Sequence, residues 1–367
     1  MVLAEIALPT EYVSAKLTRA ITIAGPISEL IVEKSINGTC RLGNPFGVSP
    51  MALEAIADSY HSVYRYPDAG HEGLRDKLAG KYDVPPDNIV IGAGSVAIVD
   101  LAIKTFAGSD ENVVTSHGTF VAYNLLAEIN RRECRRAKLT DNTFSPDNVI
   151  SLCDDKTRVM FVANPNNPTG TILSHTALSE LLAALPPRIF VVVDEAYAEY
   201  VKDESYPDSF ELQKRFKNLI ILRTFSKIYG LAGLRIGYAI AHPDITRLLG
   251  KNRTPFSVNR LAATAASAAI DDTEFAKKCA AINHRERATL CRELKGMGLN
   301  AVPSHGNFVF LECSDQKEKE SIYKLLEADG IIVRDLGAFG IETGLRISVG
   351  RPEENLRLVN SLKTAGF

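Results

Sequence analysis

Short apolar segments alternate with helix-like segments between residues 88 and 241, and this alternation restricts the fold more than any other feature of the sequence. The apolar segments are continuous and rich in Val, Ile and Leu, as is typical of strands buried on both faces. Strands that alternate with helices predict an α/β fold with a mostly parallel sheet covered by helices. Strands are expected at Asn88–Gly92, Asn112–Ser116, Arg158–Ala163, Ile189–Asp194, Leu219–Arg223 and Arg235–Ala241, and helices at Ser95–Phe106 and His175–Leu185.

The sequence changes character after Pro255, which predicts a second domain. Residues 258–298 are rich in Ala and predict one or more long helices. Further strands are expected at Asn307–Glu312, Ile331–Arg334 and Leu345–Val349. We therefore predict a large α/β domain over residues 48–255, and a smaller α+β domain formed by residues 1–47 together with 256–367. Residues 1–45 are expected to form an arm with only short elements.

The composition and charge of the chain argue against several functional classes. Hydrophobic residues make up 46% and charged residues 23% of the chain, as is typical of globular proteins in solution. The formal net charge of −2 argues against a nucleic-acid or anionic-membrane partner. No apolar run is long enough to span a bilayer, and the six scattered cysteines include no C-x-x-C pair. We therefore predict a cytoplasmic enzyme with reduced thiols, no metal site and no signal peptide.

A cluster of hydroxyl and basic side chains follows the expected strand Leu219–Arg223. Thr224, Ser226 and Arg235 are suited to hold a phosphate group. Lys227 lies among apolar neighbours, which lower the pKa of a lysine and favour a covalent bond to a carbonyl compound. The alternative is an ordinary surface loop.

Polar residues also follow or interrupt other apolar strands. Asn164–Gly170 follows one strand and holds several asparagines in a turn fixed by two prolines, where the alternative is a plain turn. Asp194 ends a strongly apolar strand, where a carboxylate needs a cation or a hydrogen-bond donor. Arg334 and Arg346 lie on or beside late strands and favour an anionic ligand. A structural ion pair is the alternative for these three charged residues.

The segment Gly92–Ala97 fits the pattern G-x-G-x-x-A, which is shared with dinucleotide-binding proteins. It lies near residue 90, however, and the next strand does not end in an acid that could bind a ribose. We interpret it instead as a helix N-terminus, capped by Ser95, whose free N–H groups bind a phosphate.

Together these motifs resemble the fold-type I pyridoxal-phosphate aminotransferases, and most closely the histidinol-phosphate aminotransferase family. The resemblance runs from about Gly43 to Glu354, and its most specific part is Phe225–Tyr238. It implies ping-pong transfer of an amino group from an amino donor to a 2-oxo acid acceptor. The leading pair is histidinol phosphate and 2-oxoglutarate, in histidine biosynthesis, and the resemblance also implies a homodimer with shared active sites.

The resemblance assigns five residues to the cofactor ring. Lys227 would hold pyridoxal 5'-phosphate covalently and later carry a proton between substrate and cofactor. Asp194 would pair with the pyridine nitrogen. Asn167 and Tyr197 would hydrogen-bond the phenolic oxygen, and Phe120 would stack on the ring.

The resemblance also assigns the cofactor phosphate and the substrate. Arg346 would bind the substrate carboxylate and Arg334 a second anionic group. Tyr66 would reach the phosphate from the neighbouring subunit. Within the same chain, the phosphate would be held by Ser95, the N–H of Val96, Thr224, Ser226 and Arg235.

Departures from the family pattern keep other substrates open. The chain has Leu42–Pro45 where family members often have Asn-Glu-Asn-Pro, and Val96 where an acidic or hydroxyl residue is frequent. A tyrosine-containing segment that encloses the substrate is not evident near Pro26–Glu29. The alternatives are an aromatic amino-acid aminotransferase for Phe and Tyr and a threonine-phosphate decarboxylase-like lyase. Two alternatives come from other functional classes: an NAD-dependent dehydrogenase, and a regulator with an aminotransferase-like sensor domain.

Overall fold

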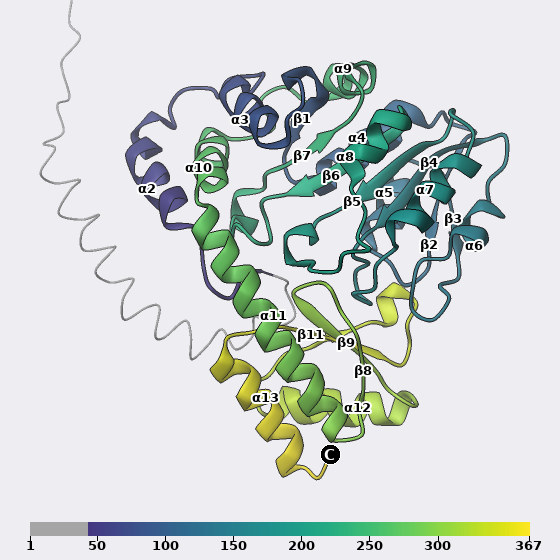
Figure 1. Ribbon diagram of the computed structural model, residues 1–367, viewed down its shortest axis with the longest axis vertical. Helices are drawn as coiled ribbons and strands as arrows, with labels where there is room; N and C mark the ends of the chain where they lie inside the picture. The colour runs from purple at the N-terminus through teal and green to yellow at the C-terminus, as the bar shows by residue number, and fades with distance from the viewer. Residues whose placement is uncertain (1–42) are drawn as a thin grey trace, which may run out of the picture.

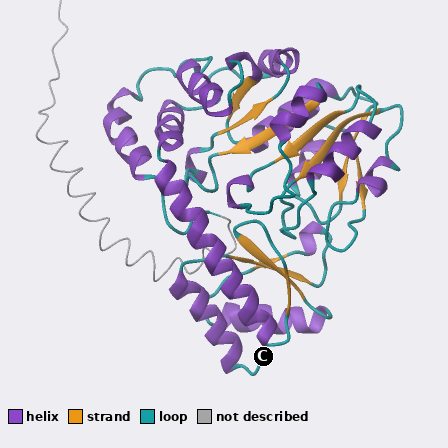
Figure 2. Ribbon diagram, viewed as in Figure 1, coloured by secondary structure: helices purple, strands orange, loops and turns teal. Residues whose placement is uncertain are grey.

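The computed structural model describes residues 43–367, which form two sheets with helices around them (Figure 1). All but the last three residues of the predicted N-terminal arm, the segment Pro26–Glu29 and most of the N-terminal part of the smaller domain lie outside these residues. Figure 2 shows the strands in two separate groups. None of the helices in residues 43–367 has the length and hydrophobicity needed to cross a membrane.

The larger sheet has seven strands and is mostly parallel, as predicted. Five neighbouring strands, β6 to β3 in spatial order, run parallel. β7 runs antiparallel to both of its neighbours, β6 and β1. In spatial order the strands are β1 (Ile89–Gly92), β7 (Gly237–Ile240), β6 (Leu219–Thr224), β5 (Phe190–Asp194), β4 (Thr157–Ala163), β2 (Asn112–Ser116) and β3 (Glu133–Ala137).

Two details of this sheet correct the sequence analysis. β7 begins at Gly237 rather than at Arg235, because Arg235 has a left-handed backbone (φ 57°) and ends a short 3₁₀ turn, η5 (Ala232–Leu234). β3 was not predicted, because its sequence Glu-Cys-Arg-Arg-Ala is polar and it lies at the exposed edge of the sheet.

The position of β1 contradicts a dinucleotide-binding unit. Among residues 43–367, β1 is an edge strand whose one partner is the antiparallel β7. The following α4 (Ser95–Phe106) leads to β2, which is separated from β1 in the sheet by the four strands β7, β6, β5 and β4. A dinucleotide-binding unit requires two parallel strands joined by the helix, so the Gly92–Ala97 motif here serves another purpose.

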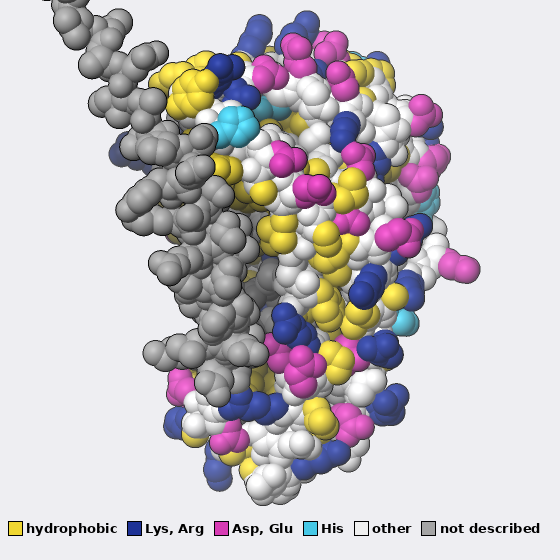
Figure 3. Space-filling view, turned by 90° about the vertical axis from the view of Figure 1, so that its left-hand side faces the viewer, with side chains coloured by type: hydrophobic (Ala, Val, Ile, Leu, Met, Phe, Trp, Pro, Cys, Tyr) yellow, Lys and Arg dark blue, Asp and Glu magenta, His cyan; other side chains and the backbone are white. Residues whose placement is uncertain are grey.

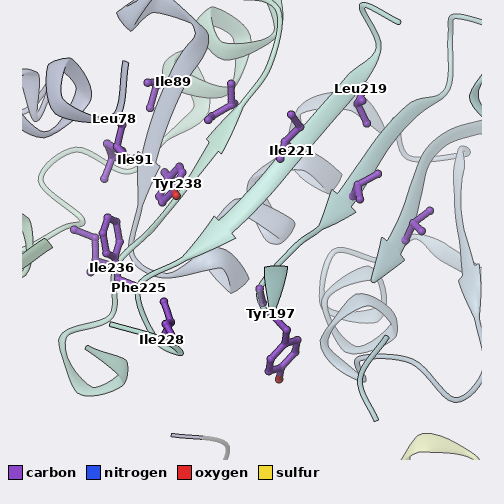
Figure 4. Close-up of a cluster of buried hydrophobic side chains, with 14 of the residues drawn as sticks. Leu78, Ile89, Ile91, Tyr197, Leu219, Ile221, Phe225, Ile228, Ile236 and Tyr238 are labelled. Atoms are coloured by element: carbon purple, nitrogen blue, oxygen red, sulfur yellow. The ribbon is translucent and has the colours of Figure 1, made fainter. Parts of the chain in front are cut away.

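Successive residues of the central strands face opposite sides of the sheet, and each side has its own hydrophobic core. Val191 and Val193 of β5 pack with residues of α3 (Glu72–Tyr82), α7 (His175–Ala184) and α10 (Arg260–Asp271), on a side that we call the α7 face. Val192 packs with residues of α4, α5 (Ala122–Ile129) and α9 (Pro243–Asn252), on the opposite side, which we call the α4 face. On β6, Leu219 and Ile221 point to the α7 face (Figure 4). Helices therefore cover both faces, as the continuous apolar strands predicted.

Of the helices of this part, the predicted Ser95–Phe106 is confirmed, and the one predicted at His175–Leu185 ends one residue earlier, at Ala184. The helices are α2 (Pro50–Ser59), α3 (Glu72–Tyr82), α4, α5 (Ala122–Ile129), α6 (Pro146–Ile150), α7 (His175–Ala184), α8 (Ser209–Arg215), α9 (Pro243–Asn252) and α10 (Arg260–Asp271). The further 3₁₀ turns are η2 (Tyr60–Ser62), η3 (Pro86–Asn88) and η4 (Ala198–Tyr200).

The smaller sheet is antiparallel and has its own core. The helical region 258–298 divides into α10 and α11 at Asp272, whose side chain caps α11 by accepting from the N–H of Phe275. The expected strand Ile331–Arg334 is shorter and lies later in the chain, as β10 (Arg334–Asp335). Of the four expected residues, Arg334 is the one that pairs with β11. The elements are α11 (Thr273–Gly296), β8 (Asn300–Val302), β9 (Phe308–Glu312), α12 (Gln316–Ala328), β10 (Arg334–Asp335), η6 (Gly337–Phe339), β11 (Gly344–Ser348) and α13 (Pro352–Thr364).

Candidate active site

A cavity of about 380 Å³ lies where the carboxyl ends of β4, β5 and β6 face the smaller sheet. This is the edge of a parallel sheet at which ligands bind. All predicted site residues except Tyr66 line it. The lining residues are Ser95, Val96, Phe120, Val121, Tyr123, Ala163, Pro165, Asn167, Asp194, Ala196, Tyr197, Thr224, Ser226, Lys227, Ala232, Arg235, Arg334, Phe339 and Arg346.

Lys227 provides a nucleophilic amine to this cavity. It lies three residues beyond the end of β6, and its Nζ is 5.1 Å from the centroid of the Tyr197 ring. Burial, and after it the nearby guanidinium of Arg346, lower the pKa of Lys227 to about 8. A large fraction of the amine is therefore neutral at slightly alkaline pH, as a covalent bond to a carbonyl compound requires.

Asp194 ends β5 and is 6% exposed. Burial raises the pKa of Asp194 to about 6, while hydrogen bonds and the charge of Lys227 oppose this rise. Its Oδ2 accepts from the hydroxyl of Tyr123 at 2.9 Å, and its Oδ1 accepts from the N–H of Ala196 at 3.2 Å. At neutral pH the group is mostly ionised, and a cationic ligand atom beside it would favour the carboxylate further.

The first turn of α4 and the segment after β6 form a cationic cradle at one end of the cavity. The N-cap of α4 is Gly94, not Ser95 as predicted, and Ser95 is the first helical residue. Thr224 Oγ1 is 3.0 Å from Ser226 Oγ, which in turn accepts from Arg235 at 3.5 Å. Helix N–H groups, hydroxyls and a guanidinium together suit a phosphate ester.

Gly94 is the position that lets this cradle close. Its backbone has φ 85° and ψ 162°, a region that is almost restricted to glycine. A Cβ atom at this position would lie 2.6 Å from Nη2 of Arg235. Only glycine therefore allows the guanidinium to lie against the first turn of α4.

The smaller sheet contributes the opposite wall of the cavity. Nη1 of Arg346 donates to Oδ1 of Asn167 at 2.5 Å, which joins β11 to the loop after β4. The guanidinium carbons of Arg346 and Arg334 lie 5.8 Å and 5.9 Å from the centroid of the Phe339 ring. Two cations on this wall would attract anionic groups of a substrate.

These residues fit the pyridoxal 5'-phosphate that the sequence resemblance implies. The cavity contains a buried amine with a lowered pKa in Lys227 and a buried carboxylate in Asp194. It also contains a cradle for a phosphate and the aromatic side chains of Phe120 and Tyr197. Each group of the cofactor therefore has a chemically suitable partner within one cavity.

Seven lining residues were not predicted, among them the aromatic residues Tyr123 and Phe339, and one predicted residue lies elsewhere. Tyr123 follows the predicted Phe120 by three residues, about one helical turn, and this spacing could have identified it. Phe339 lies in η6 between the two arginines in sequence and gave no comparable signal. Tyr66 is 79% exposed and packs in a tilted arrangement against Phe256, with 5.0 Å between ring centroids, outside the cavity of its own chain.

Comparison with known proteins gives consistent results. The sequence model of the family "Aminotransferase class I and II" matches residues 37–362. The chain is 38% identical over 342 residues to histidinol-phosphate aminotransferase 1 of Nitrosococcus oceani, with 92% of each chain covered. It is 40% identical over 323 residues to histidinol-phosphate aminotransferase 2 of Ralstonia nicotianae, which covers 88% of this chain and 86% of the relative.

Solved structures agree with these sequence relationships. The histidinol-phosphate aminotransferase of Sinorhizobium meliloti, in complex with pyridoxal-5'-phosphate, is 27% identical, with a TM-score of 0.84. The comparison covers 89% of this chain and 90% of that one. A Thermus thermophilus aspartate aminotransferase mutant, 20% identical, has the same fold with a TM-score of 0.80 over 89% of this chain and 95% of that one.

Proposed function

We propose that this chain, which belongs to the class I and II aminotransferases and among them to the histidinol-phosphate aminotransferases, transfers the amino group of histidinol phosphate to 2-oxoglutarate. This reaction is a step of histidine biosynthesis. The observation that carries the proposal is a single cavity that joins Lys227 and Asp194 to two arginines on the opposite wall, Arg334 and Arg346.

The cofactor is pyridoxal 5'-phosphate, which, when bound, withdraws electrons from the substrate carbon that carries the amino group. Lys227 would hold it, and its neutral amine would then accept and return the proton of that carbon. Asp194 would keep the ring nitrogen protonated, because a carboxylate beside it stabilises the cationic form. Phe120 would pack on the ring, and Asn167 and Tyr197 would hydrogen-bond its phenolic oxygen.

The cradle at the N-terminus of α4 would hold the cofactor phosphate. The N–H groups of Ser95 and Val96 point out of the first turn of the helix, where a negative charge is favoured. The hydroxyl groups of Thr224 and Ser226 and the guanidinium of Arg235 would complete the set of donors. Fixing the phosphate in this way would also fix the position of the ring relative to Lys227.

The two arginines of the smaller sheet would orient the substrates. Arg346 is buried, hydrogen-bonded to Asn167 and close to Lys227, so it would bind the carboxylate next to the reacting carbon of glutamate or 2-oxoglutarate. Arg334 is more exposed and lies further along the same wall, where it would bind the second carboxylate or the phosphate of histidinol phosphate. Both substrates of the proposed reaction carry anionic groups that such a wall would attract.

We further propose that the enzyme is a homodimer whose active sites are completed by Tyr66 of the partner subunit. Large hydrophobic side chains are exposed on and near α2, among them Leu53, Val63, Tyr64 and Tyr66, with exposed fractions of 53–79%. The face that Figure 3 shows, on the α2 side of the molecule, has hydrophobic side chains among the charged ones. An exposed apolar surface of this kind favours burial against another protein surface.

Two further proposals concern organisation and location. The two sheets have separate hydrophobic cores, which supports a large and a smaller domain. Because α10 packs in the core of the larger sheet, the boundary that we propose lies near Asp272, and not after residue 255 as the sequence predicted. The six cysteines are scattered without a disulfide-like spacing, which supports a cytoplasmic location.

A half-reaction tests the function directly. The purified protein is loaded with pyridoxal 5'-phosphate, and the absorption band of the bound cofactor is followed after histidinol phosphate, glutamate, phenylalanine or tyrosine is added separately. Rapid loss of the band with histidinol phosphate and with glutamate is expected. Loss with phenylalanine or tyrosine but not with histidinol phosphate would replace the proposal with an aromatic amino-acid aminotransferase.

A further inference from the structure

Behind the active-site cavity, one guanidinium joins two carboxylates of the same short segment. Nε and Nη2 of Arg223 donate to Oε2 of Glu195 at 2.9 Å and 2.6 Å. Nη1 of Arg223 lies 3.5 Å from Oε1 of Glu199. One side chain on β6 therefore holds two points of the segment that follows β5.

This cluster is enclosed and well hydrogen-bonded. The side chain of Glu195 has no exposed surface, and its second oxygen accepts from the hydroxyl of Ser209. The guanidinium of Arg223 lies 5.7 Å from the ring centroids of both Tyr82 and Phe210. Charge-assisted hydrogen bonds in such surroundings have well-defined geometry, and breaking them leaves a buried charge without its partner.

The cluster is joined through the backbone to the groups that face the cavity. Glu195 directly follows Asp194, and its N–H donates to the carbonyl oxygen of Leu222 at 2.9 Å, which ties the ends of β5 and β6 together. Because the side chains of successive strand residues point to opposite faces of the sheet, Asp194 points to the α4 face and Glu195 to the α7 face. Tyr197 lies between the two glutamates in sequence.

We infer that Arg223 is a positioning residue for the active site, because it fixes the segment 195–199 and so keeps Asp194 and Tyr197 in place in front of Lys227. The geometry needs the fork of an arginine, since a lysine ammonium cannot reach Glu195 and Glu199 with the same set of donors. A displaced Asp194 would support a positive charge on the Lys227 nitrogen less well, because its carboxylate lies close enough to raise the pKa of the free lysine. The same nitrogen, once bonded to the cofactor, would carry the proton that titrates in the loaded enzyme. The inference rests on the pyridoxal cofactor of the proposed function, but not on the identity of the substrate.

The test uses the conservative variant Arg223→Lys and a matched control, Arg158→Lys. Arg158 is the second residue of β4 and pairs with Glu111 at 2.6 Å, with side chains 26% and 22% exposed, far from the carboxyl ends of the strands. Three quantities are measured for the loaded enzymes: the thermal midpoint, the pH midpoint of the cofactor absorption band without substrate, and the kcat and KM for glutamate.

For Arg223→Lys we expect kcat to fall about tenfold or more, with KM changed less than about twofold, because misplaced catalytic groups slow the reaction more than they weaken binding. The pH midpoint of the band should fall by about 0.5 unit or more. Arg158→Lys should change neither quantity. A lower thermal midpoint for Arg223→Lys together with an unchanged kcat and band midpoint would show that Arg223 only stabilises the fold.

A second variant covers the case in which Arg223→Lys does not fold. Glu199→Gln removes the more weakly held carboxylate, whose side chain is 18% exposed, and should shift the band midpoint in the same direction by a smaller amount. No shift in this variant would contradict the inference. The substrate-free titration keeps this test separate from the proposed function, which fails instead if the wild-type band does not respond to histidinol phosphate.

Discussion

Arg334 and Arg346 are direct register partners on the neighbouring antiparallel strands β10 and β11. Their guanidinium groups both lie within 6 Å of the ring centroid of Phe339 and line the same cavity. Like charges directly opposite each other on neighbouring strands are unfavourable unless other groups compensate them. Their arrangement on the wall of the cavity therefore favours a ligand with negative charge at two positions, as in glutamate and 2-oxoglutarate.

Removing Arg346 should impair the recognition of α-carboxylates. For Arg346→Ala we expect kcat/KM for glutamate to fall about 30- to 1,000-fold, which corresponds to the loss of about 2–4 kcal/mol from a charge-assisted contact. Steady-state kinetics with glutamate provides the measurement. Arg334→Ala is the matched comparison, because it should reduce activity with glutamate but leave activity with a monocarboxylic amino acid such as phenylalanine nearly unchanged. Unchanged glutamate turnover in Arg346→Ala would contradict the assigned role.

Tyr123 should adjust the acid limb of the pH–rate profile. Its hydroxyl donates to Asp194, and this hydrogen bond lowers the pKa of that carboxyl, which burial raises to about 6. Tyr123→Phe removes the bond, so the pKa of Asp194 should rise and the carboxylate should be lost at a higher pH than in the wild type. We expect the acid limb of kcat/KM to move to higher pH while the rate on the alkaline side changes little. An acid limb that stays in place would exclude this effect of Tyr123 on Asp194.

The sequence predicted those parts of the fold and site that follow from local patterns. The buried strands and the polar residues at their carboxyl ends, such as Asp194, could be recognised because each lies next to a continuous apolar run. The antiparallel direction of β7 could not, because it depends on the path of the chain between Thr224 and Gly237. The left-handed backbone of Arg235 belongs to the same connection and is set by it.

Contacts between segments that are far apart in the sequence could not be predicted either. Phe339 enters the cavity because the carbonyl oxygen of this residue accepts from the N–H of Gly118, which brings η6 against the segment after β2. Asn167 and Arg346 are 179 positions apart in sequence, and their hydrogen bond depends on how the two sheets face each other. Such relationships are set by packing across the whole chain rather than by local preference.

The attachment of the cofactor should depend on pH through Lys227. Burial lowers the pKa of this lysine to about 8, so the amine is mostly protonated below pH 8 and mostly neutral above it. The rate at which the apoprotein binds pyridoxal 5'-phosphate covalently should therefore rise with pH and reach half of its plateau near pH 8. Borohydride reduction followed by peptide mapping measures the attachment, and Lys227→Ala is the control. In Arg346→Ala the midpoint should move to higher pH, because the guanidinium of Arg346 lowers the pKa of Lys227. For the wild type, a midpoint near 10.5, the ordinary pKa of a lysine, would contradict the assignment.

Gly94→Ala should weaken cofactor binding by disturbing the phosphate cradle. The backbone of Gly94 has φ 85° and ψ 162°, and the new Cβ would lie 2.6 Å from Arg235. We expect the free energy of unfolding to decrease by about 1–3 kcal/mol and the affinity for pyridoxal 5'-phosphate to fall. Gly80→Ala is the control, because a Cβ there meets nothing within 4 Å and should stabilise α3 by about 0.5–1 kcal/mol. Chemical denaturation and cofactor titration measure both variants, and equal cofactor affinity in the two would argue against the cradle.

Mixed dimers should show whether Tyr66 acts across a subunit interface. Tyr66 is 79% exposed and lies outside the cavity of its own chain, so its proposed contact with the cofactor phosphate requires a second copy. Lys227→Ala and Tyr66→Ala homodimers are each expected to have low activity. In a mixed dimer, the site that keeps Lys227 would receive an intact Tyr66 from the Lys227→Ala subunit, so about half of the wild-type activity per dimer should return. If Tyr66 acts within its own chain, mixing should restore nothing, and a chain that sediments as a monomer at all concentrations would contradict the shared site.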